Sequence, residues 1–163
     1  MNGIQITLRT LHRGERHMAE ELVTVSDRHR PEHEVFHIAT DIAAWSREHV
    51  RLLAETAADH GLYLTGPPDA SSEGVLGALR LKASEVVGGH PEPGLLLLRD
   101  LRDLHLAATH NSLHWEMLAQ AAQATKDTGL LGLASSCHPQ TLRQMRWTNT
   151  MIKALSPQLL STL

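Results

Sequence analysis

The first part of the chain carries two helical stripes of apolar side chains, and one ionisable residue interrupts each stripe. At alternating steps of three and four residues, the first stripe covers positions 4–25 and the second covers positions 35–52. Glu15 interrupts the first stripe and His49 interrupts the second. Burying a carboxylate or an imidazole costs free energy unless the group is paired, hydrogen-bonded or bound to a metal ion. The two stripes therefore predict a helical bundle with a polar centre.

Length and composition limit the fold class. With 163 residues, of which 42% are hydrophobic, the chain is long enough to form one domain with its own core, expected to cover residues 1–163. Leu and Ala dominate the apolar residues, whereas there is a single Phe and a single Tyr. This composition favours helix over sheet, so we expect an all-α protein.

Charge and cysteine content exclude several classes of partner. The net charge is −3, with both signs mixed along the chain, and no basic patch is present that would hold nucleic acid or an anionic membrane. A single cysteine, Cys137, excludes an internal disulfide, and no apolar run resembles a signal peptide or a membrane span. We expect a cytoplasmic protein. Most of the 12 histidines are expected at the surface, including His29, His33, His37 and His60.

Four long helices and one long connection are expected. The helices cover about 4–28, 32–61, 95–127 and 139–155, and the second is expected to end at Gly61. Gly129 and Gly132 indicate a turn before the fourth helix, and Cys137 would lie just before that helix begins. The connection, about 62–94, is rich in Gly and Pro and contains a weakly amphipathic segment at about 73–87.

Two helical hairpins joined by one long crossover are typical of ferritin-like bundles. The chain resembles the ferritin-like proteins related to rubrerythrin, especially the stress-associated bacterial family with a short extra helix in the crossover. The segment 11–15 (LHRGE) resembles the first metal-binding helix of that family, and 47–52 (REHVRL) resembles the histidine end of its second helix. The resemblance implies an antiparallel four-helix bundle with a di-iron centre.

That centre takes one Glu from each of two helices and a Glu-x-x-His from each of the other two. Glu15 and His49 match the pattern, but Ser46 stands where the second helix should supply a carboxylate. On the third helix the expected carboxylate falls near Thr109 or His110, and on the fourth helix residues 144–148 offer no strong ligand. Too few carboxylates remain to balance two iron ions, so the standard centre is expected to be lost.

A single transition-metal ion, iron or zinc, is an alternative. His110 and His114 share one helical face, as two imidazole ligands of one ion would, and Glu15, His49 and His12 are the other candidate ligands. In a competing interpretation, His110 and His114 are a partly solvated flank of their helix. His49 with these two histidines also resembles the histidine triad of DinB-like metal-dependent hydrolases and transferases.

The tryptophans favour a filled centre over a metal site. Trp45, Trp115 and Trp147 each lie near the middle of a different helix, where three indoles would occupy the space that a metal pair needs. Glu15 and His49 would then form a buried hydrogen-bonded pair. We expect a non-enzymatic, stress-related or interaction protein that forms a homodimer through an exposed apolar helix face. The alternative is a metal-binding protein or enzyme, such as an iron oxidase.

Overall fold

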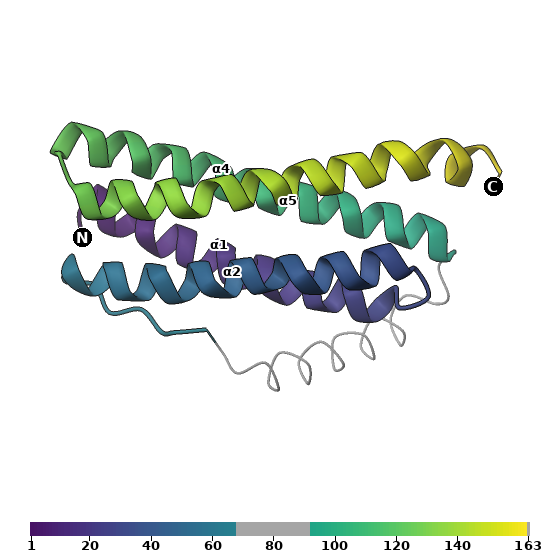
Figure 1. Ribbon diagram of the computed structural model, residues 1–163, viewed down its shortest axis with the longest axis horizontal. Coiled ribbons are helices and arrows are strands. Elements are labelled where there is room, and N and C mark those ends of the chain that lie inside the picture. The colour runs from purple at the N-terminus through teal and green to yellow at the C-terminus, as the bar shows by residue number, and fades with distance from the viewer. Residues whose placement is uncertain (68–91, 163) are drawn as a thin grey trace.

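The expected all-α fold is confirmed in a computed structural model, which describes residues 1–67 and 92–162. Four helices are described in these ranges, and no strand occurs in them (Figure 1). The helices are α1 (Gly3–Arg28), α2 (His33–Asp59), α4 (Pro93–Thr125) and α5 (Thr128–Ser161). The amphipathic segment expected at about 73–87 lies outside the described residues.

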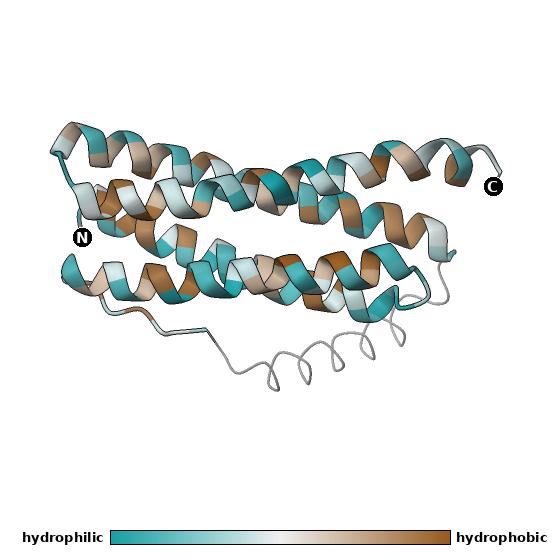
Figure 2. Cartoon of the chain, viewed as in Figure 1, coloured by the Kyte–Doolittle hydropathy of each residue, from teal (hydrophilic) through white to brown (hydrophobic). Residues whose placement is uncertain are grey.

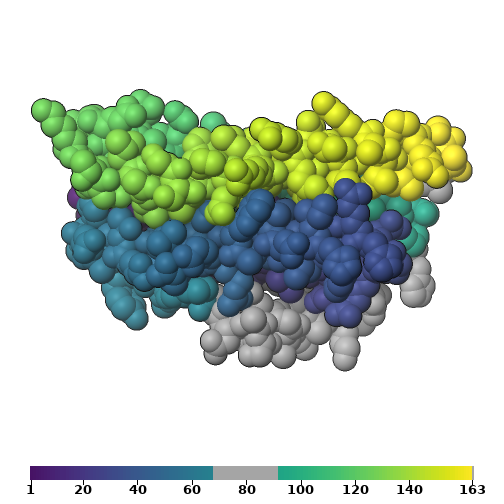
Figure 3. Space-filling view, viewed as in Figure 1, coloured from purple at the N-terminus to yellow at the C-terminus, as the bar shows by residue number. Residues whose placement is uncertain are grey.

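The four helices pack as a ring in which every neighbour is antiparallel. Helix α1 contacts α2 and α4, and α5 contacts α4 and α2, whereas the two diagonal pairs make no comparable contact. Helix α2 ends at the end of the bundle where α1 begins, and α4 begins at the opposite end (Figure 1). Figure 3 shows α5 lying along α2 on one face of the molecule. Apolar and polar segments alternate along the helices, as expected for amphipathic elements (Figure 2).

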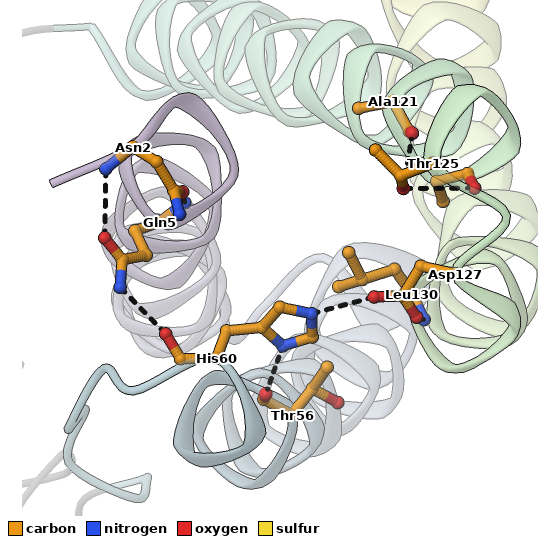
Figure 4. Close-up of polar contacts among 9 residues, drawn as sticks. Asn2, Gln5, Thr56, His60, Ala121, Thr125, Asp127 and Leu130 are labelled. Carbon is orange, nitrogen blue, oxygen red and sulfur yellow. Dashed lines mark hydrogen bonds and ion pairs between the residues drawn. The ribbon is translucent and has the colours of Figure 1, made fainter.

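Polar side chains join three helices at one end of the bundle (Figure 4). His60, just after α2, places its Nε2 atom 2.9 Å from Oδ2 of Asp127, and Gln5 of α1 donates from Nε2 to the His60 carbonyl oxygen. Hydrogen bonds to the Thr56 carbonyl and to the Asp127 carboxylate raise the pKa of His60. His60 was expected at the surface, but its side chain is partly buried by these contacts.

Helix α5 begins at Thr128, so the expected start at residue 139 is wrong. Asp127 caps the helix by accepting a hydrogen bond from the backbone N–H of Leu130 at 3.0 Å. Gly129, Gly132 and Pro139 therefore lie inside the helix. Their poor helix propensity is overcome by the burial of a continuous face, which begins with Leu130, Leu133, Ala134, Cys137 and Thr141.

The longer α5 changes the interpretation of Cys137. The residue lies within the helix and is buried, so the field at a helix start does not act on its thiol. Burial raises the pKa of Cys137 to about 12. Cys137 is therefore a small packing residue of the core.

A buried ion cluster joins α1 to α4 at the other end of the bundle. Asp100 Oδ2 accepts a hydrogen bond from Arg28 Nη1 at 2.6 Å and lies 2.8 Å from His29 Nε2. Burial alone would raise the pKa of Asp100, but the hydrogen bonds from His29 and Arg28 outweigh it and lower the pKa. The expectation that His29 is a surface residue is wrong, because Asp100 pairs with the imidazole inside the bundle, where the side chain is 5% exposed.

The corrected start of α5 predicts that Gly132→Ala stabilises the protein. A Cβ atom at this position meets nothing within 4 Å, and alanine in a helix interior is favoured over glycine by about 0.5–1 kcal/mol. Urea unfolding followed by circular dichroism measures the change. The matched variant Gly61→Ala should lose about 1 kcal/mol, because residue 61 has φ +69°. Destabilisation by Gly132→Ala would place residue 132 in a turn.

Candidate functional site: the buried polar centre

A layer of buried polar side chains divides the core of the bundle into two hydrophobic clusters. Leu11, Leu53 and Leu118 belong to one cluster, and Met18 and Ala108 belong to the other. The segments between the two clusters carry buried polar residues on every described helix: Glu15, Ser46, His49, Asn111, Ser112, Thr141, Gln144 and Thr148. The sequence-predicted polar centre is therefore present, and all four helices contribute to it.

Glu15 is the only fully buried carboxylate of this layer, and one of its oxygen atoms gathers three contacts. Trp115 donates from Nε1 to Glu15 Oε1 at 2.9 Å, and Thr141 donates from Oγ1 to the same oxygen at 3.4 Å. His49 Nδ1 lies 3.2 Å from it, which is ion-pair distance although the angle is not that of a hydrogen bond. Glu15 on α1 thereby connects to α2, α4 and α5.

His49 faces oxygen atoms with both of its ring nitrogens. Its Nε2 atom donates to Oε1 of Gln140 at 2.7 Å, while Nδ1 faces the Glu15 carboxylate. Burial by itself would lower the pKa of His49, but the interactions with Glu15 and Gln140 outweigh burial, so the pKa is raised. An acceptor facing each ring nitrogen favours the doubly protonated imidazolium, and in that state His49 forms a buried ion pair with Glu15. The Trp115 indole packs edge-on against this ring.

The remainder of the layer consists of amides and hydroxyls. Gln144 donates from Nε2 to Ser46 Oγ at 2.9 Å and to the Ile42 carbonyl at 3.1 Å. Several buried atoms have no partner among the described residues: Glu15 Oε2, Gln144 Oε1, and both amide atoms of Asn111. The layer is polar throughout, and its hydrogen bonds are incompletely satisfied.

The buried residues do not fit a di-iron centre. Ser46 and Gln144 occupy the inward positions of α2 and α5 where the pattern needs carboxylates. On α4 the inward residue is Asn111, not Thr109 or His110 as expected, since His110 is exposed and the Thr109 hydroxyl donates to its own helix. Amides and hydroxyls cannot balance the charge of two iron ions. In addition, no group of three or more His, Cys, Asp or Glu side chains in residues 1–67 and 92–162 is arranged to hold a metal ion.

Of the five candidate ligands, Glu15 and His49 are the two that meet inside the bundle. His12 is buried next to Thr65, whose carbonyl oxygen lies 2.6 Å from His12 Nε2, and burial lowers the pKa of His12. His110 and His114 lie side by side on the outer side of α4, with ring centroids 4.3 Å apart and ring planes tilted by 37°. His114 Nδ1 also contacts the His110 carbonyl at 2.8 Å. This agrees with the solvated-flank interpretation of the two residues.

Trp115 alone of the three tryptophans fills the centre. It is 0% exposed and packs within one hydrophobic cluster, with its indole N–H on Glu15. Trp45 and Trp147 are only partly buried and pack against the other cluster. The expectation of three indoles in one layer is wrong, because the faces of α2 and α5 turn Ser46 and Gln144 inward in their place.

One polar arrangement is invisible in the sequence. Ser112 Oγ lies 2.8 Å from His138 Nε2, and His138 Nδ1 lies 3.8 Å from Glu116 Oε2. The order Ser, His, Glu resembles that of a hydrolase triad. However, Ser112 and His138 lie in the middle of α4 and α5. The backbone N–H groups there are hydrogen-bonded within the helix, so they cannot form an oxyanion hole. The i,i+4 spacing of Ser112 and Glu116 is readable from sequence, whereas their pairing with His138 requires the register of α4 on α5.

Comparison with known proteins gives no assignment: no family model, curated protein or solved structure matches the chain. Within the described part of the chain, no helix is both long and apolar enough to span a membrane.

The ion pair predicts a characteristic dependence of stability on pH. The pKa of His49 is raised on folding, so protonated His49 stabilises the folded protein. This contribution to the free energy of unfolding is fully present below about pH 6.5 and is lost as the pH rises through the folded pKa. In Glu15→Gln the main partner is gone and burial remains, so the pKa of His49 should fall. NMR titration of the imidazole resonances measures both values.

Urea unfolding between pH 6 and 9 should show the same effect. The pKa of His60 is also raised, so His60 too makes the free energy of unfolding fall as the pH rises. The effect of His49 is therefore measured as the difference in this pH dependence between the wild type and Glu15→Gln. A smaller loss of stability with rising pH in the variant is expected. If wild-type His49 titrated below its ordinary range, the ion pair would be refuted.

Proposed function

We propose that this protein is a ferritin-like bundle that has lost its di-iron centre and acts as a non-enzymatic, stress-related or interaction protein. The arrangement of the helices supports the ferritin-like relationship. Both hairpins are antiparallel, and the end of α2 and the start of α4 lie at opposite ends of the bundle, as one long crossover requires (Figure 1). The inward positions of a di-iron site carry Ser46, Asn111 and Gln144 in place of carboxylates.

The observation that carries this proposal is the ion pair between Glu15 and His49. The two residues that match a metal-binding pattern are already engaged: Trp115 and Thr141 donate to Glu15, and Gln140 accepts from His49. A doubly protonated imidazole has no lone pair to offer a metal ion. One carboxylate oxygen of Glu15 and both ring nitrogens of His49 therefore face protein groups, while Glu15 Oε2 has no partner among the described residues.

Association with a second copy is the proposed mode of action. Helix α4 exposes four large apolar side chains: Leu95 (43% exposed) in its first turn and, further along, Leu106 (60%), Leu113 (59%) and Met117 (51%). Positions 106, 110, 113 and 117 are spaced by four, three and four residues. This spacing is the same whichever end of the helix it is counted from. A two-fold axis between His110 and Leu113 would place Leu106 against Met117 of the second copy, as an isologous interface requires. We call Leu106, Leu113 and Met117 the α4 apolar stripe.

Metal independence is the first expected outcome. Protein purified without a tag or chelator should contain far less than one iron, zinc or copper per chain by plasma mass spectrometry. Its melting temperature should be unchanged by EDTA or by added Fe²⁺ or Zn²⁺, because no ligand set holds the metal in the folded state. The control is the double variant Glu15→Ala, His49→Ala. Near-stoichiometric metal that disappears in this variant would establish a working centre and contradict the proposal.

Dimer formation is tested by sedimentation velocity. The wild type should have about twice the chain mass of 18.0 kDa, and Leu113→Arg should be monomeric, because it places two like charges near the two-fold axis. Leu142→Arg is the matched control, since Leu142 is a 43% exposed leucine on α5, outside the stripe. A wild-type monomer, or a dimer that Leu142→Arg disrupts and Leu113→Arg does not, would exclude this interface.

A further inference from the structure

A cavity of about 530 Å³ lies between α1 and α4, outside the buried polar layer. Helix α1 lines it with Thr10, Arg13, Gly14 and His17, and α4 lines it with Asp103, Leu106, Ala107, His110 and Asn111. Its volume lies in the range typical of sites for small molecules. The buried polar centre makes no use of this cavity, whereas Leu106 and His110 of its α4 wall also lie on the proposed dimer face.

Gly14 of α1 and Asn111 of α4 both line the cavity. Asn111 is 1% exposed, and neither its amide nitrogen nor its amide oxygen has a partner among the described residues. A Cβ atom at position 14 would lie 2.0 Å from Asn111 Oδ1, so the amide occupies the space of a missing side chain. Leaving a buried donor and acceptor unpaired costs free energy, and a ligand that bonds to them would recover it.

Arg13 and Asp103 are the two fully ionised side chains that line the cavity. The carboxylate of Asp103 is paired with Arg102 at 2.9 Å, so it does not neutralise the other groups. Arg13 is exposed and forms no ion pair with the described residues. His17 and His110 add two imidazoles, while Leu106 and Ala107 supply an apolar wall.

We propose that this cavity binds a small organic carboxylate with a short apolar chain. Arg13 pairs with the carboxylate, the apolar chain lies on Leu106 and Ala107, and the amide of Asn111 exchanges a hydrogen bond with the polar end. Arg is suited to this role because its guanidinium binds a carboxylate through two parallel hydrogen bonds. The neutral analogue of the same length lacks the group that Arg13 recognises.

Octanoate and octan-1-ol are matched ligands for the test, since they differ only in the charged group. In ¹⁵N-NMR titrations, octanoate should shift the backbone resonances of Gly14, Ala107 and Asn111, and octan-1-ol should bind at least about tenfold more weakly. Arg13→Gln should weaken octanoate binding by about tenfold. The control Arg143→Gln removes an exposed guanidinium from α5 and should leave the affinity unchanged.

The isosteric variant Asn111→Leu separates binding from folding. It should weaken octanoate binding while the melting temperature stays equal or rises, because the variant removes an unpaired buried amide. Equal affinity for octanoate and octan-1-ol, no loss in Arg13→Gln, or resonance shifts confined to residues outside the cavity would each overturn the proposal. These outcomes are independent of the metal content, so they leave the proposed metal-free function as a separate question.

Discussion

The buried ion pair between Glu15 and His49 is the interaction on which the rest of the structure depends. A carboxylate and an imidazolium that are 0% and 1% exposed are tolerable only if each faces the other and both find further partners. These partners come from every neighbouring helix: Trp115 from α4, and Gln140 and Thr141 from α5. The pair therefore requires all four helices to be in register at one level of the bundle.

This requirement has consequences for both packing and chemistry. The polar layer separates two hydrophobic clusters, so sliding one helix along another would bury apolar side chains against the ion pair. Such layers can specify register at some cost in stability, and we propose this role here. The same contacts occupy the two residues that could otherwise bind metal. In our proposals, recognition falls to the outer surfaces of α1 and α4.

The two surface features depend on this arrangement in different ways. The α4 apolar stripe follows from the helix period alone, because the residues of α4 that face inward leave Leu106, Leu113 and Met117 outside. The cavity lined by Asn111 depends on the close approach of α1 to α4, which only glycine at position 14 permits. The sequence of one helix is therefore enough to predict the α4 apolar stripe, whereas the cavity can be found only when the contact between α1 and α4 is known.

The sequence by itself determined the all-α class, the bounds of α1 and α2, and the burial of Glu15 and His49, because these follow from local periodicity and from the cost of burying charge. It misplaced the start of α5, because Gly129, Gly132 and Pro139 disfavour a helix that the Asp127 cap and a buried face stabilise. Only the tertiary structure decided that Asn111 and Gln144 face inward, that His110 faces outward, and that His29 meets Asp100. Such pairings depend on the rotation and register of helices far apart in the chain, which no single helix period encodes.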